Sequence, residues 1–422
     1  MERKYINEVK SGKVLVKGWV HDSRDLGKIR FLILKDISGI IQITSHKDKT
    51  ERKIFELIKK INRESVLEIE GKAVKNKKAP SGIEIIPEKI TVLAEADEKL
   101  PIDVSDFSKT ELSKRLDYRF LDFHRKKIQA IFKIQSEITN SFKEFFYKKG
   151  FIEMQPPCII SSASEGGTDL FPVRYFEKNA FLAQSPQLYK QMLACSMEKT
   201  FMITPVWRAE KHNTIRHINE IRQMDIEMAF SGQEEVMKEL EEVVKYIVIQ
   251  IIKKCKSELD LLGLKLKIPK AVYLAYEEAV KKLEIKSGDD FSSEQEKKLC
   301  GMYKGDIVLV HSWPGSLKPF YIMPKDEKED SELSEGFDAL YKGTEISSGG
   351  QRIHIPELLE KMLKKKGLDA KNFRHYIDSF RFGSPEHAGW SIGLERFTQT
   401  LLELDNIREA TMFPRDRDRI AP

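Results

Sequence analysis

Residues 204–230, TPVWRAEKHNTIRHINEIRQMDIEMAF, set opposed charges between two segments with the pattern of half-buried strands. The stretch holds four basic residues, four acidic residues and two histidines. Near its end, Met224, Ile226 and Met228 alternate with Asp225 and Glu227. Since side chains point to opposite faces of a strand in turn, one face would be apolar and the other would carry two carboxylates.

The first half of this stretch has the same period. Arg208 and Glu210 would share one face of the preceding strand. Antiparallel pairing of the two strands around residues 211–222 would form a surface of guanidinium and carboxylate groups, suited to a ligand that carries both signs of charge. A solvated hairpin with surface ion pairs would show the same pattern, so this hairpin alone does not identify a site.

Length and composition set the broad class of protein. The chain has 422 residues, which is more than one hydrophobic core usually holds and predicts two domains. Because 72 basic and 66 acidic residues leave a net charge of only +6, contact with a polyanion would depend on local basic patches. The four cysteines form no C-x-x-C pair, which fits a reducing cytoplasm. The sequence has no segment typical of a signal peptide or a membrane span, so we expect a cytoplasmic protein without a membrane partner.

The N-terminal part predicts a small β-barrel. Residues 13–94 contain five short alternating runs separated by glycine-containing turns, with one helical segment at residues 51–61 between the third and fourth runs. This order predicts a five-stranded barrel of the OB type over residues 1–95. Residues 96–125, which include Pro101 and several acidic side chains, predict a hinge.

The remaining residues, 126–422, predict an α+β domain. We expect helices and strands at the following positions: helices at 126–149, ending before Gly150, at 184–197 and at 234–255; strands at 151–160, 307–314, 319–324 and 344–354; and a glycine turn that opens a helix within 389–404. The charged residues 270–305 have the pattern of an insertion with a scaffold role.

Three stretches occur in the order of the signatures of class II aminoacyl-tRNA synthetases: residues 150–157, 206–230 and 389–396. With the predicted barrel and the stretches EGGTDLFPV, QSPQLYKQ and FPRDRDRIAP, the chain resembles archaeal-type aspartyl-tRNA synthetases over nearly its whole length. Several motifs in order are more specific than any one of them. Residues 231–388 are too short for the large extra domain that bacterial relatives carry.

The resemblance implies a catalytic domain built on an antiparallel sheet flanked by helices, which uses ATP to convert L-aspartate to aspartyl-adenylate. Arg208 would hold the α-phosphate and Arg396 would lie against the adenine and the γ-phosphate, so these two are the expected catalytic residues. Glu345 and Ser348 would bind Mg²⁺, an ion that prefers hard oxygen ligands. The expected ATP-binding residues are Arg208, Ala209, Glu210, Arg216, His217, Ile218, Glu345, Gly393, Leu394, Glu395 and Arg396.

Selection of aspartate needs a cation for its side-chain carboxylate. Arg352 offers a planar fork, and Lys190, on one helix face with Gln187, offers a second cation. Asparagine-specific relatives typically have an acidic residue in place of Lys190, and bound asparagine would leave a buried cation without its anion. Outside this motif Lys190 would be an ordinary surface lysine. The expected aspartate-binding residues are Glu165, Gln187, Lys190, Arg208, Asp225, Ser348 and Arg352, with Glu165 on a glycine-rich loop that closes over the substrate.

In the barrel, the resemblance implies contacts with the tRNA anticodon. Phe31 would stack on a base, Gln42 would form a hydrogen bond and Glu84 would lie close by, although the run FLIL also fits a buried strand. Phosphate contacts are expected from Arg24, Lys28, Arg30 and Lys35.

Two barrel positions bear on the choice of tRNA. Archaeal-type relatives that charge only tRNA(Asp) tend to have Trp at the position of His21 and Lys at that of Pro80. The smaller residues here predict a non-discriminating enzyme that charges tRNA(Asp) and tRNA(Asn), because bulk and a donor are missing from the pocket for the third anticodon base. The second product would need a tRNA-dependent amidotransferase as a downstream partner. In the alternative, both residues are structural and the enzyme charges tRNA(Asp) alone.

Other functions remain as alternatives. An asparaginyl-tRNA synthetase is disfavoured by Lys190 and Asp225, and a catalytically silent tRNA-binding paralogue is disfavoured by the intact set Arg208, Glu210, Glu345 and Arg396. A homodimer is expected, since the first signature, including Pro157, forms the subunit interface in class II relatives.

Overall fold

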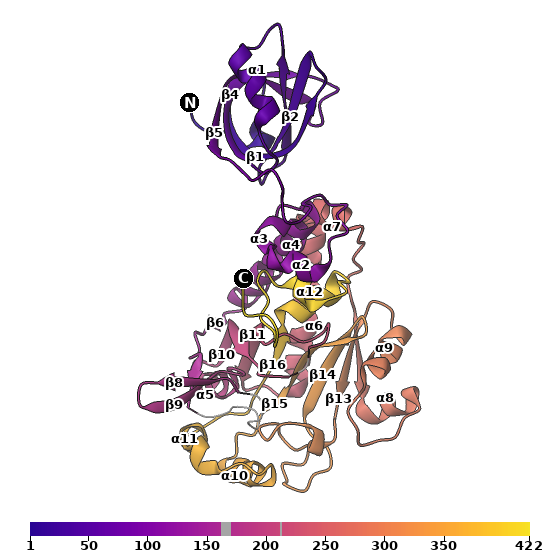
Figure 1. Cartoon of the computed structure of the whole chain (residues 1–422). Helices are drawn as coiled ribbons and strands as arrows, with labels where there is room; N and C mark the ends of the chain where they lie inside the picture. Colours follow the sequence, from indigo (N-terminus) through magenta and orange to yellow (C-terminus); the bar gives the residue numbers. More distant parts are fainter. Residues whose placement is uncertain (162–169, 212) are drawn as a thin grey trace. The chain divides into compact units, whose positions relative to one another are not determined.

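The structure, a computed structural model, describes residues 1–161, 170–211 and 213–422 (Figure 1). It divides into two compact units, Met1–Asp103 and Val104–Pro422. The division falls within the expected hinge, and the second part of that segment forms two short helices of the second unit, α2 (Leu112–Asp117) and α3 (Arg119–Asp122). Across the described residues, no helix is both long and apolar enough to cross a membrane.

The first unit is a closed barrel with strand order β1-β2-β3-β5-β4, which confirms the predicted OB-type domain. Alternate residues such as Leu32 and Leu34 fill its interior. The strand β1 contains an irregularity between Val20 and Asp22, at His21. The elements are η1 (Ile6–Glu8), β1 (Gly12–Asp25), β2 (Ile29–Lys35), β3 (Ile40–His46), α1 (Arg52–Lys60), β4 (Val66–Lys75) and β5 (Ile83–Ala94).

The second unit contains an eight-stranded sheet of order β12-β13-β14-β15-β16-β11-β10-β6, whose central strands lie side by side in Figure 1. Its pairs are antiparallel except β12 with β13 and β6 with β10, so the sheet is mixed, with an antiparallel centre. The strands are β6 (Ile152–Glu153), β10 (Lys199–Trp207), β11 (Glu220–Ala229), β12 (Ala271–Ala275), β13 (Ile307–His311), β14 (Gly336–Tyr341), β15 (Thr344–Gln351) and β16 (His387–Gly393).

One face of this sheet packs against two long helices, α4 (Lys126–Lys148) and α6 (Gln233–Lys254), which confirms the helices expected there. Met224, Ile226 and Trp390 point into this core, so Asp225 and Glu227 face the other side, as the alternation predicts. The face of the sheet opposite to this core is therefore the polar one.

The helix α4 ends as expected. Gly150, two residues after its last residue, has φ +78°, the left-handed conformation expected of a glycine that ends a helix.

The remaining elements are a three-stranded sheet of order β7-β9-β8 and shorter helices. They are β7 (Ile159–Ile160), β8 (Pro172–Tyr175), β9 (Lys178–Leu182), α5 (Gln187–Met197), α7 (Lys256–Leu262), α8 (Tyr276–Leu283), α9 (Ser293–Met302), η2 (Gly315–Leu317), α10 (Pro356–Lys365), η3 (Ala370–Phe373), α11 (Arg374–Arg381), α12 (Leu394–Leu401) and η4 (Ile407–Ala410).

Three sequence-based expectations need correction. Residues 151–160 form two short strands in different sheets, since Pro156 and Pro157 lie between them and cannot donate to a ladder. Residues 319–324, bounded by two prolines, form only isolated bridges. Residues 270–305 are no separate insertion, because β12 pairs with β13 at the edge of the main sheet.

Candidate active site

A cavity of about 270 Å³ opens on the polar face of the eight-stranded sheet. Its floor comes from β11, β15 and β16, where Asp225, Ser348 and Ser391 stand opposite one another in register. Most of the expected ATP- and aspartate-binding residues line it: Gln187, Arg208, Glu210, Arg216, His217, Ile218, Glu345, Ser348, Arg352, Gly393, Glu395 and Arg396. The wall also includes Ser185, Gln223, Tyr321 and Ser391, which the sequence did not single out.

Five expected residues are not among these. Lys190 and Asp225 are fully buried and do not line the cavity, and Leu394 packs into the main core. Ala209 lies in the loop after β10. Glu165 lies outside the described residues.

The loop after β10 places Arg208 and Glu210 at the cavity wall. The prediction that they belong to the strand is wrong, because β10 ends at Trp207. The side-chain amide of the buried Asn219 donates to the carbonyl oxygens of Arg208, at 2.7 Å, and Glu210, at 3.1 Å. These bonds replace ladder bonds and hold the loop in shape.

A buried network of four charged side chains adjoins the cavity, which one of them, Arg352, lines. Lys190 Nζ lies 2.8 Å from Asp225 Oδ1 and 3.4 Å from Glu227 Oε2. Arg352 donates to both Glu227 oxygens, at 2.8 and 3.3 Å. The expectation that bound asparagine would leave a buried cation without its anion is therefore wrong, since Asp225 and Glu227 already balance Lys190 and Arg352.

Burial and these contacts shift the pKa of each carboxyl group in the network. Burial raises the pKa of Asp225, and Lys190 only partly opposes the shift. Burial also acts to raise the pKa of Glu227, but Arg352 and Lys190 outweigh it, so that this pKa is lower than usual. Glu227 is thus held as an anion at the centre of the network.

The glycine at position 389 leaves the space for Glu227. The two residues are paired across β11 and β16. A Cβ atom on Gly389 would overlap the Glu227 carboxylate and the carbonyl oxygen of Ile226. At Gly393, by contrast, the nearest atom to an added Cβ would be 3.7 Å away, on Arg396. Only the first glycine of this pair is required for packing.

The expected Mg²⁺ ligands lie beside a further carboxylate. Burial, and then the neighbouring Asp338, raise the pKa of Glu345 to about 7, against the effect of Arg396 and Lys318. Asp338 stands opposite Ser348 in the β14–β15 pair and bonds Lys318 at 2.5 Å. A carboxyl group that shares its surroundings with a second carboxylate suits a divalent cation. No cluster of three or more His, Cys, Asp or Glu that could hold a metal occurs among the described residues, so Glu345 and Ser348 would need substrate oxygens to complete the site.

Sequence reasoning missed Glu227 and Asp338. The signal for Glu227 was present, since it follows Asp225 by the strand period in QMDIEM. Asp338, within GFDALY, lies in a run that reads only as a strand. Its position beside Glu345 follows from strand pairing, which is not visible in the local pattern.

The segment that follows α12 holds the loop between β10 and β11. Arg408 donates to the carbonyl oxygen of Thr214 at 2.9 Å and to Asn213 Oδ1 at 2.6 Å. The amide of Ile407 donates to the carbonyl oxygen of Ile215, and the amide of Asn219 to that of Arg415. Residues 407–415 therefore hold this loop in place, and Ile407 itself lines the cavity.

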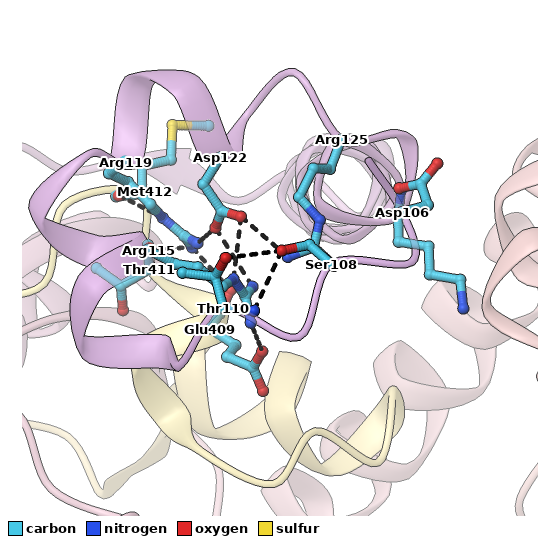
Figure 2. Close-up of polar contacts among 11 residues, drawn as sticks. Asp106, Ser108, Thr110, Arg115, Arg119, Asp122, Arg125, Glu409, Thr411 and Met412 are labelled. Carbon is cyan, nitrogen blue, oxygen red and sulfur yellow. Dashed lines mark hydrogen bonds and ion pairs between the residues drawn. The ribbon is translucent and has the colours of Figure 1, made fainter. Parts of the chain in front are cut away.

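The middle of the same segment is fixed by the cluster shown in Figure 2. Three arginines surround the fully buried Asp122: Arg119 at 2.6 Å, Arg115 at 3.0 Å and Arg125 at 3.2 Å. Arg115 also lies 3.4 Å from Glu409, and Arg119 donates to the carbonyl oxygen of Met412. The helices α2 and α3 are thereby tied to residues 409–412.

In the barrel, Phe31 lies on the outer surface. It is half-buried, whereas Leu32 and Leu34 fill the core, which favours a stacking role over a core role. Gln42 donates to Glu84 at 3.0 Å, and Thr44, which pairs with Phe31, donates to the same carboxylate at 2.5 Å. Half-buried Phe31, Gln42 and Glu84 thus form a polar and aromatic cluster on this face, with the buried Thr44 between them.

The expected basic contacts divide into two groups. Arg24 and Lys28 are exposed, as a phosphate contact requires. The phosphate contacts expected of Arg30 and Lys35 are wrong, because both side chains are buried: Arg30 lies over the Phe55 ring and Lys35 bonds Glu64 at 2.9 Å.

The two positions expected to bear on the choice of tRNA lie at irregular points of the barrel. His21 is half-buried at the irregularity in β1. Pro80 is exposed in the turn between β4 and β5.

Comparison with known proteins identifies the family. Residues 111–417 match the family model of tRNA synthetases class II (D, K and N), and residues 14–93 match that of the OB-fold nucleic acid binding domain. The chain therefore belongs to the class II aminoacyl-tRNA synthetases of the D, K and N group, and the resemblance drawn from the three signatures is confirmed.

Individual relatives are similar over nearly their whole length. The aspartate–tRNA(Asp/Asn) ligase of Methanocaldococcus jannaschii is 44% identical over 98% of this chain and 96% of its own. The aspartate–tRNA(Asp) ligase of Pyrococcus horikoshii is also 44% identical, over 98% and 97%. The structure of an asparaginyl-tRNA synthetase from Pyrococcus horikoshii, complexed with asparaginyl-adenylate, superimposes with a TM-score of 0.95 at 33% identity and covers 100% of both chains.

Proposed function

We propose that this synthetase is an aspartate–tRNA ligase that forms aspartyl-adenylate from L-aspartate and ATP and transfers aspartate to tRNA(Asp) and tRNA(Asn). The observation that carries the amino-acid assignment is Arg352, which lies at the cavity wall with its guanidinium oriented by Glu227. Archaeal relatives named as ligases for aspartate support the same assignment.

In the first step, an oxygen of the aspartate α-carboxylate attacks the α-phosphorus of ATP, and the bond to pyrophosphate breaks. The nucleophile is already ionised, so the site needs placement and charge neutralisation more than a base. Arg208 would neutralise the α-phosphoryl oxygens, and Arg216, His217 and Arg396 would meet the outer phosphates. In the second step, a hydroxyl of the terminal tRNA ribose attacks the carbonyl carbon and AMP leaves.

Glu345 and Ser348 fit a magnesium ion bound with ATP, since they place hard oxygen donors beside Asp338. When bound, Mg²⁺ would offset phosphate charge. The residues themselves hold the donor oxygens at fixed positions on paired strands.

Discrimination against asparagine follows from donor chemistry. Arg352 presents only N–H donors, and Glu227 accepts two of them. The side-chain carboxylate of aspartate can accept hydrogen bonds from the remaining N–H groups of Arg352 with both of its oxygens. The amide of asparagine has only one oxygen acceptor, and its NH₂ group is a donor that cannot bond to the guanidinium. The similar fold of an asparaginyl-tRNA synthetase means that this choice depends on the pocket and not on the architecture.

Pyrophosphate exchange into ATP tests the assignment. We expect exchange with aspartate and at most weak exchange with asparagine. Arg352→Leu should reduce aspartate-dependent exchange by more than a hundredfold, since it removes a buried charged hydrogen bond and leaves Glu227 without its main partner. Equal exchange with asparagine would overturn the proposal. A melting curve checks that the variant folds.

The tRNA choice rests on His21 and Pro80. Two relatives with equal identity carry different tRNA specificities in their names, so overall similarity does not decide the matter. We expect purified enzyme to charge transcripts of both tRNA(Asp) and tRNA(Asn), and His21→Trp with Pro80→Lys to lower charging of tRNA(Asn) more than that of tRNA(Asp). Charging of tRNA(Asp) alone by the wild type would leave a discriminating synthetase. A tRNA-dependent amidotransferase is the downstream partner that the second product requires.

We further propose a cytoplasmic homodimer. Ile152 and Ile159, which flank the prolines of the first signature, are 47% and 45% exposed, as expected of residues that a second copy would cover. Sedimentation of Ile159→Glu, with the wild type as reference, would reveal a monomer if this face is the interface.

A further inference from the structure

The guanidinium of Arg216 is held from outside its own loop. Its Nη1 atom donates to Ser293 Oγ at 2.6 Å and lies 3.4 Å from Glu296 Oε2. Its Nη2 atom donates to the carbonyl oxygen of Gly343 at 3.3 Å and to Thr344 Oγ1 at 3.4 Å. Ser293 and Glu296 belong to the first turns of α9, in the region that the sequence predicted to be scaffold only.

The helix α9 is a firm support for this contact. Leu299 and Cys300 anchor it in a hydrophobic core. Ser292 caps its N-terminus by accepting a hydrogen bond from the amide of Gln295. At its other side, a Cβ on Gly343 would lie 2.9 Å from the side chain of Lys297, so the helix and the β14–β15 turn are in close contact.

The carboxylate of Glu296 is close to both cations at the phosphate end of the cavity. Its side chain is 13% exposed. Burial raises the pKa of Glu296, and the charges of Arg216 and Arg396 oppose that shift. Both arginines line the cavity.

We propose that Ser293 and Glu296 are positioning residues, which hold Arg216 ready for the outer phosphates of ATP. An arginine on a loop loses much rotamer freedom when it binds a ligand. Hydrogen bonds to a fixed helix already restrict the Arg216 side chain before ATP binds. The guanidinium is therefore in position for the outer phosphates, which leave as pyrophosphate. This inference rests on the proposed role of Arg216.

Steady-state pyrophosphate exchange tests it. Glu296→Ala should raise the KM for ATP or lower kcat so that kcat/KM for ATP falls roughly tenfold to hundredfold, the effect of one lost charged hydrogen bond, with the KM for aspartate unchanged. Ser293→Ala should act in the same direction, and Glu296→Gln, which keeps an acceptor, should restore part of the loss. Glu294→Ala, an exposed carboxylate of the same turn, is the matched control and should behave as the wild type.

A double-mutant cycle separates this inference from the proposed function. If Glu296 acts through Arg216, Glu296→Ala should cause no further loss in an Arg216→Ala background. Additive losses, or a lower KM for ATP in Glu296→Ala, would overturn the positioning role while the role of Arg216 stands. An Arg216→Ala variant with wild-type use of ATP would overturn the proposed role of Arg216 itself.

Discussion

Glu345 is a carboxyl group whose surroundings oppose its charge. Burial and Asp338 raise its pKa to about 7, well above the value of 4.5 for an ordinary Glu. A raised pKa in the folded state means that the folded protein binds a proton which the unfolded chain has released. The contribution to stability is therefore full below the unfolded pKa and is lost as the pH rises through 7.

This shift predicts a pH-dependent effect of Glu345→Gln. In metal-free buffer, the wild type should lose stability relative to this variant between about pH 4.5 and pH 7.5, by an amount on the order of 3 kcal/mol. Urea unfolding at several pH values measures the difference. Addition of Mg²⁺ together with ATP at pH 8 should stabilise the wild type more than the variant. A difference that is independent of pH would contradict the assignment.

For individual residues, the sequence predicted which side chains lie close together but not which ion pairs they form. Arg352 and Lys190 were expected as two cations of one pocket, and they do lie on one network. That Glu227 contacts both cations depends on distances between β11, α5 and the residue that follows β15. Such distances follow from packing of segments far apart in the chain.

The pairing of β11 with β16 leaves no room for a side chain at position 389. Gly389→Ala would force its methyl group into Glu227 and the carbonyl oxygen of Ile226. We expect a loss of stability of roughly 1–3 kcal/mol, together with weaker binding of aspartate. Thermal unfolding is the measurement, with Gly393→Ala as the control, since an added methyl there meets ordinary contacts.

Unchanged stability in Gly389→Ala would show that Glu227 can move away. The network with Arg352 would then be less rigid than its hydrogen bonds indicate. Aspartate binding, measured by calorimetry, would show whether such movement matters.

The helix pair α2–α3 depends on one carboxylate. Asp122→Asn would leave Arg115, Arg119 and Arg125 close together in the interior with much less opposing charge. We expect a loss of roughly 3–5 kcal/mol in the free energy of unfolding, because an uncompensated buried charge is costly. Asp117→Asn, which breaks one exposed ion pair with Arg419, should cost less than about 1 kcal/mol. Urea unfolding of the two variants compares them directly.

Periodicity located the long elements well and the short ones poorly. The apolar stripes of α4 and α6 and the alternation of β11 are strong local patterns, and the structure confirms them. The strand β12 is short, and its partner β13 lies beyond two helices, so residues 270–305 gave no sign that they extend the main sheet. The α9 contact with Arg216 depends on that extension.

For the whole molecule, the division into two units predicts that the two chemical steps respond differently to a change in the barrel. Phe31→Ala should weaken aminoacylation by roughly 1–3 kcal/mol, the value of one lost base stack, with aspartate-dependent pyrophosphate exchange nearly unchanged. Ile33→Ala, a half-buried neighbour on the same strand, is a control for general damage to β2. Equal loss of both activities in Phe31→Ala would contradict the separation of roles.

The bonds from residues 407–415 to the β10–β11 loop also concern the order in which the chain is made. Domains generally fold as they emerge from the ribosome, N-terminal parts first. A nascent chain that has reached residue 400 already contains Arg208, Glu345, Arg352 and Arg396. It still lacks Arg408 and the backbone groups of Ile407 and Arg415 that fix the loop. The β10–β11 loop can therefore take its final shape only after this late segment is made, and an interrupted translation product would carry the expected site residues without the bonds that hold this loop.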